Sequence, residues 1–169
     1  MIGEMQMLVY KLLGGGSIVI SAILFYFESQ SYNKKFLKQL SAYISLIEFI
    51  KNQVGSYLMP IDEIIKHCDD NIIKECIMND KTDMSHIDNL NDIINLACYY
   101  IDKETLDIIY RFANDFGLKY RSEQLVSCEL YINELREIFN KKKENYEKEK
   151  RVRFVLCICL SFSMVLLLI

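Results

Sequence analysis

The stretch that decides the fold is residues 37–58, LKQLSAYISLIEFIKNQVGSYL. Its apolar side chains recur at intervals of three and four, the spacing that places them on one side of an α-helix. Proline is tolerated in the first turn of a helix, so Pro60 allows a second, shorter helix to begin at Ile61. In the first helix, the apolar side chains on one side form a stripe that consists of Leu37, Leu40, Ile44, Ile47, Ile50, Val54 and Leu58. The segment therefore predicts a long helix that buries one face.

Three more stripes with helical spacing follow, and no segment shows the apolar–polar alternation of a half-buried strand. They comprise Ile87, Leu90, Ile94, Ala97 and Ile101; Leu106, Ile109, Ala113 and Phe116; and Leu125, Cys128, Ile132, Leu135 and Phe139. Asp83 and Asp102 can cap the helices that follow them. Gly117 can end the helix before it, and Ser122 can begin the last one. The predicted fold class is all-α.

Both ends of the chain are apolar, and residues 12–27 and 154–169 contain no charged side chain. A helix over residues 8–27 would reach about 30 Å, the thickness of a bilayer's hydrocarbon core. The second stretch reaches only about 24 Å, so it would either include Val152 or let Arg151 and Arg153 extend toward the lipid head groups. We therefore expect transmembrane helices in residues 1–28 and 154–169, with a cytosolic helical bundle in residues 29–153.

Two alternatives to membrane-spanning helices are weighed for these ends. A cleaved signal peptide would have a basic start and a small-residue cleavage site, neither of which the N-terminal stretch contains. The C-terminal stretch can instead be a buried core helix, although such helices usually have a polar face and this one offers only Ser161 and Ser163. Nothing breaks the helical pattern after Ser122, which allows one continuous helix to the end of the chain.

The basic residues set the expected orientation, because Lys and Arg beside a membrane segment stay on the cytoplasmic side. Lys34, Lys35 and Lys38 follow the first apolar stretch. A basic collar precedes the second and consists of Lys141, Lys142, Lys143, Lys148, Lys150, Arg151 and Arg153. Both stretches thus place the middle of the chain in the cytoplasm and both termini outside, with the collar beside anionic lipid.

Small residues in the first apolar stretch offer a helix contact within the membrane, where close packing drives association. Gly14, Ser17 and Ser21 are the candidate contact residues, although glycines in such a helix can also serve only to bend it.

The charge distribution argues against a nucleic-acid partner. Residues 28–140 contain 12 basic and 19 acidic side chains, whereas residues 141–153 contain 7 and 3. An acidic domain repels phosphate backbones, and the basic collar adjoins a predicted membrane segment. Among the tyrosines, Tyr32, Tyr99, Tyr100 and Tyr120 are candidates for exposed contacts with a protein partner.

The sequence offers no recognisable catalytic or cofactor-binding pattern. The six cysteines include no Cys-x-x-Cys pair, so free thiols are expected in a reducing cytosol. His67, Cys68, Cys76 and His86 do not match the spacing of a usual zinc site. Asp69 and Asp70 are expected in a solvated turn. We therefore expect a protein that is not an enzyme, without metal or cofactor.

The order of these segments resembles the stage III sporulation protein AB family of endospore-forming bacteria. The similar features are the run LLGGG at residues 12–16, the acidic Glu48, the sequence YLMPI at residues 57–61, and LDIIYRFANDFGLKYRSEQ at residues 106–124. In the last of these, Phe116, Gly117 and Gln124 are the matching positions.

The resemblance implies a structural role. Members of that family belong to the channel complex between mother cell and forespore, in the mother-cell membrane around the forespore, and resemble the inner-membrane platform protein of type II secretion and type IV pilus systems. The insert would then dock a cytosolic secretion-type ATPase, stage III sporulation protein AA, and the membrane helices would meet other membrane subunits. The alternatives are a membrane-anchored regulator with a ligand-sensing helical domain and, less favoured, an enzyme.

Overall fold

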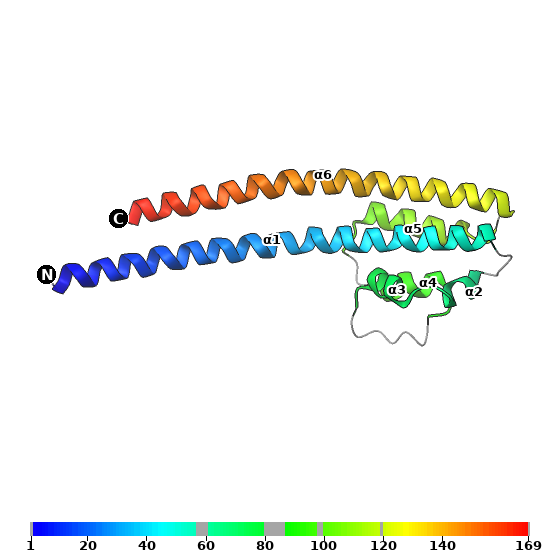
Figure 1. Cartoon of the computed structure of the whole chain (residues 1–169), viewed down its shortest axis with the longest axis horizontal. Coiled ribbons are helices and arrows are strands. Elements are labelled where there is room, and N and C mark those ends of the chain that lie inside the picture. The colour runs from blue at the N-terminus through cyan, green and yellow to red at the C-terminus, as the bar shows by residue number, and fades with distance from the viewer. Residues whose placement is uncertain (1, 57–60, 80–86, 98–99, 119, 169) are drawn as a thin grey trace. The chain divides into compact units, whose positions relative to one another are not determined.

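Where its structure is described, the chain forms helices joined by short irregular segments. The computed structural model describes residues 2–56, 61–79, 87–97, 100–118 and 120–168. Within these ranges it contains helices and no strand (Figure 1), which confirms the all-α prediction. The helices are α1 (Ile2–Ser56), α2 (Ile61–Lys66), α3 (Asp70–Ile77), α4 (Leu90–Leu96), α5 (Lys103–Asp115) and α6 (Arg121–Leu168).

The chain divides into two compact units, each of which is described by itself. One unit consists of residues 35–143, and the other consists of residues 1–34 together with residues 144–169. Over the described part of the chain, no helix meets the length and hydropathy that a membrane crossing requires.

Helix α1 is the central element of the unit formed by residues 35–143. Each residue turns the helix by about 100°, and on this basis the buried side chains of α1 cover more than half of its circumference. This buried sector is wider than the apolar stripe of an ordinary surface helix. The sequence predicted only one side of this surface. The buried residues are Phe36, Gln39, Leu40, Ala42, Tyr43, Ile44, Leu46, Ile47, Ile50 and Val54. Figure 1 shows the reason, since α6 and the group α2, α3 and α4 lie on opposite sides of α1.

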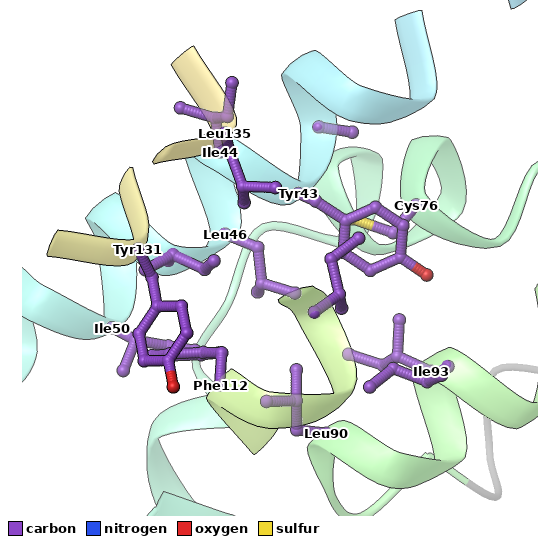
Figure 2. Packing of buried hydrophobic residues seen from close by; sticks show 14 of the residues in the cluster. Tyr43, Ile44, Leu46, Ile50, Cys76, Leu90, Ile93, Phe112, Tyr131 and Leu135 are labelled. Atoms are coloured by element: carbon purple, nitrogen blue, oxygen red, sulfur yellow. The ribbon is translucent and has the colours of Figure 1, made fainter. Parts of the chain in front are cut away.

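Side chains from α1, α3, α4, α5 and α6 meet in one core (Figure 2). The rings of Phe112 and Tyr131 pack edge to face at 5.5 Å between centroids. The Tyr131 hydroxyl donates a hydrogen bond of 2.8 Å to Asp115. Burial and this acidic partner raise the pKa of Tyr131 to about 12. Leu135 is completely buried, as predicted, whereas Phe116 only packs against the edge of the core.

Two expectations for residues 69–101 hold only in part. Asp69 and Asp70 are exposed, as expected, but they begin a helix rather than form a turn, because Asp69 is the N-cap of α3 and accepts a hydrogen bond from the Asn71 amide at 2.8 Å. The stripe from Ile87 to Ile101 is not one helix, since α4 covers only its middle. Ile87, Ala97 and Ile101 are nevertheless buried, because the irregular segments on either side of α4 also pack on the core.

Local capping defines the ends of α4 and α5. Asn89 caps α4 through a reciprocal pair of bonds with Asp92. Asp102 caps α5 by accepting from the Thr105 amide at 3.0 Å, as predicted. Gly117 follows α5 with φ of 88°, the left-handed conformation that glycine adopts at low cost. The last helix begins at Arg121, one residue before the predicted Ser122, and the predicted cap Asp83 lies outside the described residues.

Candidate protein-binding surface

Two ion pairs join α1 to α6 along one surface groove. Lys51 lies 3.5 Å from Glu129, and Arg136 binds Glu48. These positions ascend along α1 while they descend along α6, so the two helices are antiparallel within the unit of residues 35–143. All four side chains are at least partly exposed, and pairs of this kind contribute only about 0 to 1 kcal/mol each. We therefore infer that these two ion pairs fix the register of α1 against α6 and contribute little to stability.

Arg121, the first residue of α6, contacts the C-terminal end of α1. Its Nε donates to the Val54 carbonyl at 2.8 Å, and its guanidinium also binds the Gly55 carbonyl. The last four carbonyl groups of a helix have no partner within the helix, and a cation beside them interacts favourably with the helix dipole. The first residue of α6 thus caps the C-terminus of α1.

Lys142, one of the collar residues, makes contacts within the folded unit. Its Nζ lies 2.8 Å from an Asp102 carboxylate oxygen and 5.2 Å from the ring centre of Phe36. Burial alone would raise the pKa of Asp102, but the hydrogen bonds from Lys142 and Thr105 outweigh burial and lower this pKa. The same carboxylate therefore caps α5 and ties it to α6.

Gln39 is a completely buried polar side chain that joins three segments. Its Nε2 donates to the Cys76 carbonyl in α3 at 2.7 Å, and its Oε1 accepts from the Tyr100 amide at 2.9 Å. The burial of an amide costs free energy unless its groups are paired. Gln39 thus fixes α3 and the segment before α5 against α1.

The outer face of α6 carries exposed apolar side chains where a solvated helix usually has polar ones. Val126 is 67% exposed and Leu130 is 60% exposed. Glu123 and Glu137 are exposed on the same side of the helix. The buried stripe of α6 does not predict this face. Its signal in the sequence is the pair of apolar residues four apart on the opposite side of the helix, Val126 and Leu130.

The predicted contact tyrosines differ in their surroundings. Tyr120 is 83% exposed and Tyr32 is 56% exposed. Tyr100 is half-buried, and the Lys35 ammonium lies 4.8 Å from its ring centre. Tyr99 lies outside the described residues. Of the three described tyrosines in this group, Tyr120 is therefore the most exposed.

The collar is an exposed segment of α6, and Lys142 is exposed although it contacts Asp102 and Phe36. The collar is partly neutralised by its own acids, since Lys148 lies 2.7 Å from Glu144 and Arg153 lies 2.9 Å from Glu149. These pairs are four residues apart on one helix face, which adds modest helix stability. The exposed collar residues are Lys141, Lys142, Lys143, Lys148, Lys150, Arg151 and Arg153.

In the predicted small-residue contact of α1, the serine hydroxyls form hydrogen bonds with backbone carbonyls of the same helix. Ser17 donates to the Gly14 carbonyl and Ser21 donates to the Ser17 carbonyl, each at 2.8 Å. A Cβ atom added at Gly14 or Gly16 would have nothing within 4 Å. The face is therefore open in this structure, and the helix contact stays a prediction.

Three described cysteines are buried as free thiols in the unit of residues 35–143. Burial raises the pKa of Cys68 and of Cys128 to about 11, and it raises the pKa of Cys76 well above its ordinary value. Thiols with such pKa values are poor nucleophiles at neutral pH. Among the residues that the structure describes, no cluster of three His, Cys, Asp or Glu side chains could hold a metal ion.

The sequence model of the stage III sporulation protein AB family matches residues 11–169. The chain belongs to this family. No curated protein and no solved structure matches it. Of the positions that resemble the family pattern, Glu48 supplies the α1 side of the ion pair with Arg136, and Gly117 supplies the left-handed residue after α5. Family membership implies a role in stage III of sporulation.

Proposed function

We propose that this chain is a membrane-anchored platform subunit of the sporulation channel complex between mother cell and forespore. In this role the unit of residues 35–143 docks a cytosolic ATPase, stage III sporulation protein AA. The observation that carries the proposal is the composition of the unit's interior. Among the described residues, its buried polar side chains are Gln39 and Thr105, and its charged side chains lie at the surface, where they suit binding to a partner.

The proposal places membrane helices in residues 1–28 and 154–169, with both termini outside the cytoplasm and the chain in the mother-cell membrane. Its support is the charge-free sequence of residues 12–27 and 154–169, together with exposed apolar side chains that need an apolar environment. These side chains are Ile20, Ile23, Leu24, Phe154, Val155, Leu156, Ile158 and Phe162. The basic collar then lies beside anionic head groups, and Gly14, Ser17 and Ser21 face other membrane subunits.

One groove of the unit, between α1 and α6, differs from the pocket of a ligand sensor. A sensor of small molecules needs a largely apolar pocket with a few convergent polar groups. The groove between α1 and α6 is instead lined mostly by charged and amide side chains. These are Glu48, Lys51, Asn52, Glu129, Ile132, Asn133 and Arg136.

The test is direct binding between the full chain in lipid nanodiscs and the purified ATPase, with empty nanodiscs as the control. Residues 28–140 have 12 basic and 19 acidic side chains, so attraction to a basic partner should weaken as salt screens it. We expect the dissociation constant to rise about tenfold between about 0.05 M and 0.5 M salt. Absence of binding would refute the proposed function, and salt-independent binding would refute its electrostatic basis.

A fusion experiment tests the proposed orientation. A reporter that is active only outside the cytoplasm should be active when fused after Ile169 and inactive when inserted between Gly117 and Leu118, at the exposed end of α5. Activity at the internal site would contradict a cytosolic unit, and inactivity at the C-terminus would contradict a second membrane crossing.

A further inference from the structure

A surface groove of about 500 Å³ lies where the charged part of α6 meets its apolar C-terminal part. The described residues that line it are Glu147, Lys150, Arg151 and Phe154. They are spaced by three and four along the helix, so at about 100° per residue they fall within a sector of about 100°. The groove therefore has a charged end and an apolar end on one face of α6, within the unit formed by residues 1–34 and 144–169.

The two basic residues of the groove differ from the other cations in this part of α6. Lys148 and Arg153 are paired with acids of their own helix, at 2.7 Å and 2.9 Å. Lys150 and Arg151 are exposed, and neither forms an ion pair with another described residue. Glu147 is the one acid among the described lining residues. Two cations that stabilise no contact of the described fold are therefore available to an anion.

The apolar end of the groove continues into side chains that a soluble anion would leave uncovered. Phe154 is 51% exposed. Val155, Leu156 and Ile158 follow it on the helix, and each is more than half exposed. Exposed apolar side chains in such numbers need an apolar environment. An amphiphile that carries its negative charge beside a hydrocarbon chain matches both ends of the groove.

We propose that this groove is a binding site for an anionic phospholipid. The lipid phosphate contacts Lys150 and Arg151, and an acyl chain lies along Phe154. A guanidinium group can bind phosphate through two parallel hydrogen bonds, and an ammonium group binds it as a point charge. This inference rests on the membrane placement in the proposed function, and it adds a defined lipid site with a stated headgroup charge.

The proposed site is more specific than a general attraction between the basic collar and lipid. Lys148 and Arg153 have the same mean position along α6 as Lys150 and Arg151, yet they are not among the described residues that line the groove. General attraction depends on the charge near the membrane surface, so both pairs would contribute equally to it. Binding in the groove depends on Lys150 and Arg151.

Fluorescence quenching measures which lipid occupies the groove. The chain contains no tryptophan, so Phe154→Trp places a single fluorophore in the lining. The full-length variant is reconstituted in phosphatidylcholine bilayers with an increasing share of bromine-labelled phosphatidylglycerol, and a parallel series carries the label on phosphatidylcholine. A basic residue at an anionic surface contributes about fivefold to binding. We expect phosphatidylglycerol to bind at least about fivefold more strongly than phosphatidylcholine.

Two charge-neutralised variants of the Phe154→Trp chain provide a matched comparison. Lys150→Gln/Arg151→Gln should reduce the preference for phosphatidylglycerol to less than about twofold. Lys148→Gln/Arg153→Gln removes the same charge at the same mean position and should leave the preference unchanged within about 1.5-fold. Glutamine has a helix propensity close to that of Lys and Arg, and circular dichroism verifies that each variant is folded. Equal losses in both variants would overturn the inference, because general attraction would then account for the preference.

The remaining outcomes separate this inference from the proposed function. Equal quenching by the two lipids would overturn the lipid site while the membrane placement stands. Displacement of the labelled lipid by glycerol phosphate at constant ionic strength would reveal a site for soluble anions and would also overturn the inference. Absence of quenching by either lipid would place position 154 outside the bilayer, and the proposed membrane anchor and this inference would fail together.

Discussion

Replacement of Gln39 by Met removes hydrogen bonds from the core with little change of shape. Gln39 is completely buried, and it pairs with the Cys76 carbonyl at 2.7 Å and the Tyr100 amide at 2.9 Å. Methionine has a similar length and fills the same space, but its thioether cannot donate to the carbonyl and is only a weak acceptor for the amide. Gln39→Met therefore leaves two backbone groups without their partner.

The expected loss of stability in Gln39→Met follows from the two backbone groups that lose their partner. A buried donor or acceptor that loses its partner costs about 1 to 3 kcal/mol, so two cost about 2 to 6 kcal/mol. Burial of a thioether instead of an amide offsets part of this loss. We therefore expect Gln39→Met to destabilise the packing of α3 against α1 by about 2 to 4 kcal/mol.

Hydrogen exchange of the full chain in detergent micelles, resolved by peptide mass spectrometry, measures this effect where it arises. A loss of 2 to 4 kcal/mol corresponds to exchange about 30 to 700 times faster at amides of α3 that exchange by local opening. Asn52→Met is the matched control, because Asn52 is an exposed polar residue on the same helix. If α3 in the Gln39→Met protein exchanges within about threefold of the control, the role assigned to Gln39 is refuted.

Three further predictions concern the same unit. Leu135→Ala should lower the free energy of unfolding by about 2 to 5 kcal/mol, because Leu135 is 0% exposed. Leu130→Ala should change this free energy by less than about 0.5 kcal/mol, because Leu130 is 60% exposed. Equal denaturant midpoints of the two variants would contradict the core assignment. Burial raises the pKa of Asp102, but the hydrogen bonds from Lys142 and Thr105 outweigh burial and lower it. This lowered pKa stabilises the fold above the unfolded pKa of about 3.9, and the contribution is lost as pH falls through the folded pKa. The stability gap between wild type and Asp102→Asn, followed by denaturation from about pH 7 to pH 2, should therefore close in acid, and a constant gap would refute the ion pair. Cys128, with a pKa of about 11, should resist maleimide at about pH 7.5 in the folded chain and react after unfolding, as peptide mapping would show; rapid reaction of the folded chain would contradict its burial.

The sequence by itself determined the features whose causes are local. The helical spacing of apolar residues specified the all-α fold, because each helix must turn its apolar side chains to one side. The cap at Asp102 and the turn at Gly117 were also predictable, since the partners of a cap lie within about four residues along the chain. Helix α3 was missed because its start, Asp69 followed by Asp70, looks the same as a polar turn until its short apolar face is packed.

Only the tertiary structure decided which side chains join distant segments. Gln39 is polar and lies beside a predicted stripe, so sequence alone gave no sign that it is buried between Cys76 and Tyr100. Lys142 belongs by sequence to a basic collar, yet its ammonium group is held by Asp102, 40 positions earlier in the chain. The physical reason is the same in both cases: a hydrogen bond or ion pair forms between groups that packing brings together, and the distance along the chain does not encode that proximity.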